Sequence, residues 1–201
     1  MPEFQINQVI LKLRKLQQRS AVALVAIEGR GGAGKSTLAR QLHDETGARV
    51  IAGDDFYRVM SETERRSLND QEAYMQYVDW ERLRTQVLEP LRNGKPARFE
   101  RYHWHRNELG ETMEFDAKGV IIVEGVYSFR PELRPFYDFS LFVDTPRNLS
   151  IERCRKRPHD REFWIQRWAE VEDWYFEHMN PAEAADMVIS GQEGLAARHL
   201  A

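Results

Sequence analysis

A glycine-rich stretch between an apolar run and a polar, helix-forming run constrains this chain more than any other feature. The whole stretch, residues 22–37, reads VALVAIEGRGGAGKST. Its β-branched apolar run ends just before Gly29, and Gly29, Gly34, Lys35 and Ser36 match the spacing G-x-x-x-x-G-K-[ST] of a phosphate-binding loop. A buried strand before the loop and a helix after it are the context that this motif requires, and the sequence predicts both.

The residue types of this motif suit the binding of phosphate. Glycines allow backbone N–H groups to surround phosphate oxygens, and the helix that begins near Lys35 adds unpaired N–H groups and a positive dipole end. Lys35 can reach the β- and γ-phosphates, and the Ser36 hydroxyl can ligate Mg²⁺. A glycine-rich turn that binds nothing is the alternative, but the complete motif in its context favours ATP. The predicted ATP-binding residues of the loop are Gly29, Gly31, Gly32, Ala33, Gly34, Lys35, Ser36 and Thr37.

Composition and charge disfavour several other classes of protein. The 201-residue chain has a formal net charge of −3, without the basic excess that is typical of nucleic-acid binding. A single cysteine, Cys154, rules out an internal disulfide and indicates a reducing compartment. No apolar run approaches the length of a membrane span, and the start of the chain, MPEFQINQ, lacks the pattern of a signal peptide. We therefore expect a cytoplasmic protein with no nucleic-acid or membrane partner; a homo-oligomer remains open.

Apolar runs that predict strands alternate with helical patterns along the chain. The predicted strands are 22–27, 48–52, 97–104 (as an edge strand), 120–123, 140–143 and 187–189, and the predicted helices are 5–18, 35–44, 80–92, 147–157 and 163–179. This alternation predicts an α/β fold of the P-loop NTPase type, with a parallel sheet covered by helices on both faces. We expect one α/β domain over 1–201, with an N-terminal helix (1–20), a flap (about 58–78, helical near 70–76) and a short lid (about 153–163).

Polar residues follow three of the predicted strands, where ligands of such sheets bind. The phosphate-binding loop follows the first strand, Asp54 and Asp55 follow the second, and Glu124 follows the run VIIV. Glu124 can hold Mg²⁺ or one of its waters, with a capping or salt-bridging glutamate as the alternative. One of the two aspartates can accept a proton from an attacking hydroxyl, with an Asx-type turn as the alternative. Together these positions indicate catalysis as well as nucleotide binding.

These motifs resemble those of the uridine kinase and phosphoribulokinase-type small-molecule kinases, especially short bacterial uridine kinase-like proteins. The likeness rests on the phosphate-binding loop, on the element GDDFY at residues 53–57 and on VEG at 123–125, and it extends from about residue 22 to 191. The resemblance implies that Asp54 is the catalytic base, that Asp55 and Tyr57 contact the substrate, and that Glu124 belongs to the metal site.

The resemblance also implies candidate contacts for the phosphate acceptor. Asp79 matches an acidic residue that bonds sugar hydroxyls, with a helix N-cap as an equal alternative. Tyr102 and His105 belong to the element YHWH, where relatives carry Tyr-Asp-aromatic, and this departure leaves the identity of the acceptor open. His103 and His105 are spaced to share one face of a strand, which hints at a metal site, but polar contacts are the favoured interpretation.

A basic cluster near residue 157 matches the position of the lid in this family. Arg153 and Arg157 are four residues apart, which predicts that they share a helix face. We expect Arg157 to act on the transferring phosphoryl group, and Arg153 and Arg161 to contact ATP. A solvated basic face is the alternative, and Pro158 stands where relatives often carry aspartate, the next aspartate being Asp160.

The function predicted from these features is an ATP- and Mg²⁺-dependent kinase that phosphorylates a hydroxyl of a small molecule. A nucleoside such as uridine or cytidine is the favoured acceptor. One alternative is another hydroxyl compound, such as a vitamin-like alcohol, a sugar or a sugar acid. A nucleotide-binding regulatory module without transfer activity is a second alternative. A GTPase is disfavoured because the sequence contains no N-K-x-D element.

Overall fold

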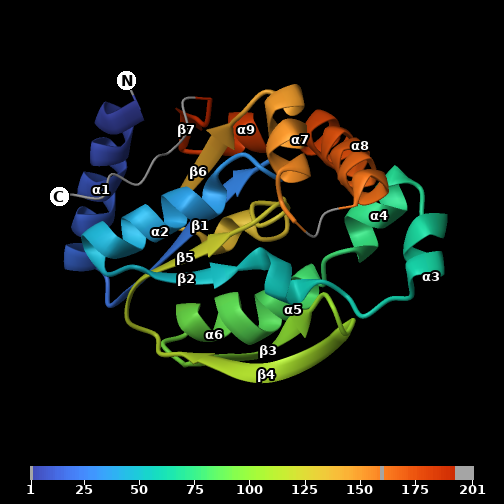
Figure 1. Cartoon of the computed structure of the whole chain (residues 1–201). Coiled ribbons are helices and arrows are strands. Elements are labelled where there is room, and N and C mark those ends of the chain that lie inside the picture. The colour runs from blue at the N-terminus through green and yellow to red at the C-terminus, as the bar shows by residue number, and fades with distance from the viewer. Residues whose placement is uncertain (1, 159–160, 193–201) are drawn as a thin grey trace.

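A computed structural model, which describes residues 2–158 and 161–192, has a five-stranded parallel sheet at its centre (Figure 1). The strand order is β2-β5-β1-β6-β7, and β3 and β4 form a separate two-stranded antiparallel sheet. The strands are β1 (Val22–Gly29), β2 (Arg49–Ala52), β3 (Ala97–His103), β4 (Glu108–Phe115), β5 (Gly119–Glu124), β6 (Phe139–Asp144) and β7 (Met187–Ser190). The predicted fold class is confirmed.

Helices connect the strands and cover both faces of the central sheet. The α-helices are α1 (Pro2–Arg19), α2 (Lys35–Thr46), α3 (Glu62–Ser67), α4 (Asp70–Gln76), α5 (Trp80–Leu83), α6 (Glu89–Arg92), α7 (Arg147–Arg155), α8 (Glu162–Met179) and α9 (Pro181–Ala184). The short helical turns are η1 (Gly53–Phe56), η2 (Arg84–Leu88) and η3 (Arg134–Phe136). In the described part of the chain, no helix combines the length and hydropathy that a membrane crossing requires.

Strand β1 is the central strand, which explains why its sequence is continuously apolar. Ala26 pairs with Val123 of β5 on one side and with Ser140 of β6 on the other. Every residue from Ala23 to Gly29 is buried, because both faces of a parallel sheet are covered in this class of fold. Side chains of β1 therefore alternate between two separate cores.

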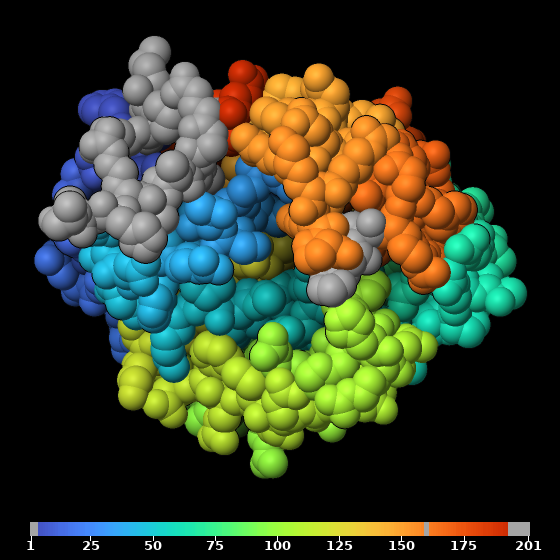
Figure 2. Space-filling model, in the orientation of Figure 1, coloured from blue at the N-terminus to red at the C-terminus, as the bar shows by residue number. Residues whose placement is uncertain are grey.

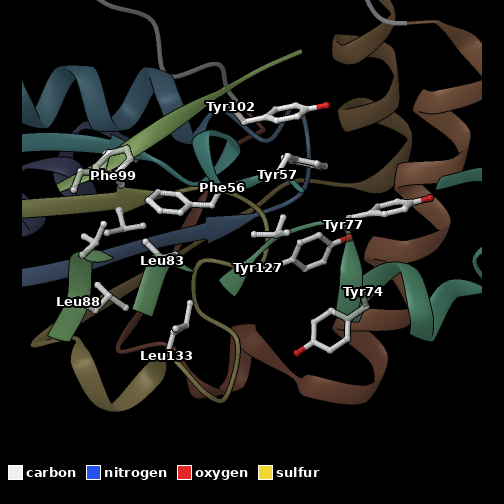
Figure 3. Close-up of a cluster of buried hydrophobic side chains, with 14 of the residues drawn as sticks. Phe56, Tyr57, Tyr74, Tyr77, Leu83, Leu88, Phe99, Tyr102, Tyr127 and Leu133 are labelled. Carbon is white, nitrogen blue, oxygen red and sulfur yellow. The ribbon is translucent and has the colours of Figure 1, made fainter. Parts of the chain in front are cut away.

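The two cores differ in composition. On one face, α1 and α2 pack aliphatic side chains, including Leu13 and Leu38, against the sheet. The core on the other face is rich in aromatic rings and includes side chains from η1, α4, the α5–α6 segment and β3 (Figure 3). There Phe56 packs against Phe99 with ring centroids 4.8 Å apart. The aromatic core borders the edge of the sheet where the motifs lie.

The strand predicted at 97–104 exists as β3, but it is not an edge strand of the central sheet as predicted. It pairs with β4 in a hairpin outside that sheet, and β2 and β7 are the edges. The sequence analysis missed β4, because most of its side chains are exposed and polar and they give no hydrophobic alternation. The hairpin contributes side chains to the cavity described below.

The segment 80–92 and the predicted flap both differ in detail from the predictions. Residues 80–92 are helical as predicted, but η2 is a π-helical turn inside the segment. The two ends of the predicted flap are joined by an antiparallel bridge between Tyr57 and Val78, and next to this bridge Asp79 N donates to Phe56 O over 2.7 Å. Its predicted helix is α4, which begins with a capping box at Asn69, and α3 was not predicted.

Candidate active site

The carboxyl ends of β2, β5 and β1 bring the three sequence motifs together. Glu124, the last residue of β5, pairs with Ala52 of β2 on one side and with Ile27 of β1 on the other. Asp54 follows β2 directly and the phosphate-binding loop follows β1. The register of the sheet therefore confirms that these three elements lie at one edge.

Two glycines allow the ends of β2 and β5 to approach closely. A Cβ on Gly53 would lie 2.9 Å from Ser128 Oγ, and a Cβ on Gly125 would lie 3.1 Å from the Cα of Gly53. Any side chain at either position would push the two strand ends apart. The glycines next to Asp54 and Glu124 thus keep the two carboxylates near each other.

The phosphate-binding loop has the conformation that its sequence predicts. Gly32 has φ +76°, and a Cβ there would lie 2.5 Å from the backbone oxygen of Ser150. Gly34, with φ +105°, precedes α2 and offers no side-chain cap to the helix. The first N–H groups of α2 are therefore available to an anion. Lys35 is 7% exposed and its Nζ donates to the backbone oxygens of Gly29 (2.9 Å) and Arg30 (2.8 Å).

Ser36 and Glu124 form a pair of oxygen ligands that fits Mg²⁺. The Ser36 hydroxyl donates to Glu124 Oε1 over 2.9 Å, so the two side chains already converge. Burial raises the pKa of Glu124, while the charge of Lys35 opposes this shift. Within residues 2–158 and 161–192 there is no cluster of three or more His, Cys, Asp or Glu that could hold a metal. Phosphate oxygens and water would supply the remaining ligands, as is usual for Mg²⁺.

Asp54 lies on the η1 turn, where it lines a cavity and is accessible from it. The surrounding protein shields the Asp54 carboxylate from bulk water and so raises its pKa, and the charges of Lys35 and Arg157 oppose the shift. A carboxylate with a raised pKa in a cleft is suited to accept a proton near neutral pH. The position of Asp54 therefore suits the role of general base that the sequence resemblance implies.

Sequence reasoning missed Glu28, a buried carboxylate at the end of β1 that forms hydrogen bonds next to the phosphate-binding loop. The side chain is 0% exposed and accepts hydrogen bonds from the N–H groups of Gly29, Tyr127 and Phe129 and from the Tyr175 hydroxyl. Burial raises the pKa of Glu28 to about 7, although these donors and Lys35 favour the charged form. Glu28 thus joins β1 to the segment after β5 and to α8. A carboxylate inside an apolar strand run was the available signal.

A cavity of about 650 Å³ opens beside the loop, between α7, α8, the flap and the β3–β4 hairpin. In Figure 2 the orange segment that contains α7 lies opposite the green segment of the hairpin on this face of the molecule. Five aromatic side chains line the cavity: Tyr57, Tyr102, Trp104, Trp164 and Trp168. The ring centroids of Tyr57 and Trp104 are 4.4 Å apart, and those of Trp104 and Trp168 are 5.8 Å apart. The volume and the aromatic lining suit a small organic molecule.

A buried arginine from the flap, Arg65, stands among these rings. It is 4% exposed, and its guanidinium lies 5.4–5.7 Å from the ring centroids of Tyr57, Tyr77 and Trp104. Its Nη2 donates to the backbone oxygen of Arg58 over 2.9 Å. No carboxylate of the described chain lies within salt-bridge distance of it. Sequence analysis missed Arg65, because nothing in a polar flap distinguishes one arginine from its exposed neighbours.

Three of the predicted acceptor contacts, Tyr57, Tyr102 and His105, line the cavity, and two do not. Asp55 instead pairs with Arg101, with its Oδ1 3.0 Å from Arg101 Nε. Asp79 takes the alternative role of N-cap, accepting from Arg82 N over 3.1 Å at the start of α5. These placements do not support a direct contact of Asp55 or Asp79 with the acceptor.

The two histidines of the hairpin do not share a strand face, contrary to the prediction. His103 ends β3 and bonds Glu111 of β4, whereas His105 lies in the turn that follows β3. His103 therefore makes its polar contact within the hairpin, which agrees with the favoured interpretation of polar contacts.

The lid arginines are divided between two positions. The prediction that Arg153 and Arg157 share a helix face is wrong, because α7 ends at Arg155. Arg157 and Arg161 line the cavity, and Arg161 Nη2 lies 3.2 Å from Glu62 of the flap. Arg153 does not line the cavity; its guanidinium donates to the backbone oxygens of Gly32 (3.5 Å) and Gln192 (3.1 Å). His159 and Asp160, inside the predicted lid, lie outside the described residues.

The fold and the arrangement of loop, carboxylates and cavity define a P-loop kinase. The chain belongs to the phosphoribulokinase/uridine kinase family, whose model matches residues 24–193. It is 33% identical over 165 residues to a uridine kinase of Staphylococcus carnosus (76% of this chain, 78% of the relative), and 32% identical over 147 residues to one of Yersinia pestis (67% of each).

The structural comparison supports the same fold. A solved structure described as a possible uridine kinase from Bacillus stearothermophilus superposes with a TM-score of 0.73 at 24% identity, covering 93% of this chain and 98% of that one. The fold class and the family resemblance expected from the sequence are therefore confirmed. The acceptor and the roles of individual residues are addressed below as proposals.

Proposed function

We propose that this protein transfers the γ-phosphoryl group of ATP to a hydroxyl of a nucleoside, with Mg²⁺ as the metal ion. The observation that carries the proposal is the position of Asp54, between a complete phosphate-binding loop and a cavity lined with aromatic side chains. A binding module without transfer activity would not need a carboxylate at this junction. The named uridine kinase relatives support a nucleoside as the acceptor.

In this mechanism the loop and its lysine hold the phosphates. The free N–H groups at the start of α2 would bind phosphate oxygens, and the Lys35 ammonium would exchange its contacts with Gly29 O and Arg30 O for the β- and γ-phosphates. Ser36 and Glu124 would hold Mg²⁺, which neutralises charge on the β- and γ-phosphates when bound.

Asp54 would accept the proton of the acceptor hydroxyl as its oxygen attacks the γ-phosphorus. One O–H bond breaks and one O–P bond forms, while the bond from the γ-phosphorus to the bridging oxygen breaks and ADP leaves. Arg157 lines the cavity together with Asp54, and its charge opposes the rise in the pKa of both Asp54 and Glu124. Its guanidinium would neutralise charge on the transferring phosphoryl group.

The aromatic lining favours an acceptor with a flat ring. Tyr57, Tyr102 and Trp104 form a cluster of rings at one end of the cavity, and a planar base could stack against them. Arg65 beside these rings offers a cation to carbonyl oxygens of the base. The same cation favours the second candidate, a hydroxyl compound that carries a carboxylate.

ADP release with Mg-ATP, measured across uridine, cytidine, D-ribose, D-fructose and D-glycerate, tests the proposal. We expect a nucleoside to give the highest kcat/KM, and Asp54→Asn to remove the stimulation. If no nucleoside stimulates ADP release while a sugar or sugar acid does, the second candidate replaces the first.

A further inference from the structure

Glu172 of α8 is a buried carboxylate in the same cavity as Asp54, and the mechanism above does not use it. Its side chain is 7% exposed and lines the cavity beside Arg30 and Gly31. Burial raises its pKa, while Lys35 and the Gly31 N–H oppose the shift. A carboxylate that is more than nine-tenths buried needs hydrogen-bond donors to offset the loss of water, and Glu172 has few of them.

Only one oxygen of Glu172 is occupied within the described chain. Oε1 accepts the Gly31 N–H over 3.1 Å, and a Cβ at position 31 would lie 3.0 Å from this oxygen. The described residues provide no other hydrogen bond and no ion pair to Glu172. Oε2 thus has no donor among the described residues, and because Glu172 lines the cavity, this is the oxygen that remains for a ligand.

Glu172 and Asp54 both line this cavity. Both carboxylates act on the phenol of Tyr57: burial raises the pKa of Tyr57, and the negative charges of Asp54 and Glu172 raise it further. Tyr57 lines the cavity as well. An acceptor that occupies this cavity with its reacting hydroxyl at Asp54 can therefore also contact Glu172.

We propose that Glu172 Oε2 accepts a hydrogen bond from a second hydroxyl of the acceptor, so that the substrate is a polyhydroxylated compound such as a ribose. The inference rests on the proposed function, and it assigns to Glu172 the sugar recognition that sequence analysis expected of Asp79. Asp79 caps α5 and does not line the cavity. An acceptor that lacks the second hydroxyl leaves a buried carboxylate unpaired, which is the basis of strong discrimination.

Steady-state kinetics with matched pairs of acceptors test this assignment. The acceptors are uridine with 2′-deoxyuridine and 3′-deoxyuridine, and D-ribose with 2-deoxy-D-ribose as a pair without the base. The variants of the full chain are Glu172→Gln, which keeps an oxygen for Gly31 N–H, Glu172→Ala, and Asp79→Ala. Glu177→Gln, an exposed position on α8, is the matched control. Quenching of fluorescence from Trp104, Trp164 and Trp168 reports acceptor binding without turnover.

In the wild type we expect kcat/KM to favour uridine over one of its deoxy analogues by about 10- to 100-fold, the range of a hydrogen bond to a charged group. Both Glu172 variants should raise the KM for uridine, leave the KM for ATP unchanged and remove the preference. The preference should survive in Asp79→Ala and in Glu177→Gln.

Several results would overturn the assignment. A preference that survives in both Glu172 variants, or one that Asp79→Ala removes, rejects Glu172 as the sugar contact while the nucleoside proposal stands. A parallel rise in the KM for ATP shows that Glu172 only supports the loop, and a fall in kcat alone shows that it acts on the proton. If only D-ribose is phosphorylated and Glu172→Gln erases its preference over 2-deoxy-D-ribose, the inference stands and the nucleoside proposal falls. ADP release that none of these acceptors stimulates rejects both.

Discussion

The two ends of the cavity are built in different ways. At the phosphate end, residues 29–37 form one continuous segment, and its lysine and serine already bond neighbouring oxygens. The acceptor end collects side chains from η1, the flap, the β3–β4 hairpin, α7 and α8, and it contains the buried Arg65, which has no carboxylate partner among the residues that the structure describes. The phosphate end is thus preformed for a ligand of fixed chemistry, whereas the acceptor end depends on five segments that can vary independently.

The largest effect should come from the residue at the junction of the two ends. Asp54→Asn keeps the shape of the side chain but removes the proton acceptor, so kcat should fall about 10²-fold or more, with ATP affinity maintained. Asp55→Asn is the matched control, because Asp55 pairs with Arg101 away from the cavity. Rapid-quench kinetics and calorimetry measure the two quantities. If Asp55→Asn abolishes turnover and Asp54→Asn does not, the catalytic base is Asp55 and the assignment to Asp54 is wrong.

Glu28 tests whether the phosphate end is held as one unit with α8. Because folding raises the pKa of Glu28 from 4.5 to about 7, the folded state binds this proton more tightly than the unfolded state. Its stabilisation is complete below pH 4.5 and is lost as the pH rises through 7. The free energy of unfolding should therefore fall with rising pH by up to about 3 kcal/mol more in the wild type than in Glu28→Gln.

Chemical denaturation of both proteins at pH 5 and pH 8 measures this difference. Asp54, Glu124 and Glu172 also have raised pKa values, but they are present in both proteins, so the difference between the two curves isolates Glu28. If the free energy of unfolding changes equally in the two proteins between pH 5 and pH 8, the four hydrogen bonds keep Glu28 charged over this range.

A substitution at Lys35 should affect binding at the phosphate end of the cavity and leave binding at the acceptor end almost unchanged. Lys35→Ala removes the only ammonium of the loop, and losing a charge-assisted contact should weaken Mg-ATP binding about 10- to 100-fold. Acceptor binding, followed by tryptophan fluorescence in the absence of nucleotide, should change little. Unchanged Mg-ATP affinity in calorimetry would reject the phosphate-binding assignment.

Arg157 should give the smallest of these effects and sharpens the role of the lid. Arg157→Ala should lower kcat about tenfold with a smaller change in ATP affinity, because its charge acts mainly in the transition state. Arg155→Ala is the control, since Arg155 is exposed and pairs with Glu162 outside the cavity. Equal, small effects of both substitutions would indicate a solvated basic face.

The same contrast explains what the sequence could predict. Gly29, Lys35 and Ser36 are close in sequence, and the alternation of strands places Glu124 and Asp54 beside them, so the fold and the phosphate end were predictable. Arg65, Trp168 and Glu172 meet only after α4, α8 and the flap have packed, and each looks like an ordinary surface or helix residue in the sequence. The hairpin partner β4 was missed for a related reason, because its stability comes from pairing with β3 and not from a buried face of its own.

Transfer of label from γ-labelled ATP tests the central claim most directly, namely that phosphate end and acceptor end serve one reaction. With Mg²⁺ and uridine, the wild type should release one ADP for each labelled nucleoside monophosphate formed, and Asp54→Asn should form almost none while still binding ATP. ADP release at the wild-type rate without labelled nucleoside, or label on water alone, would contradict the account.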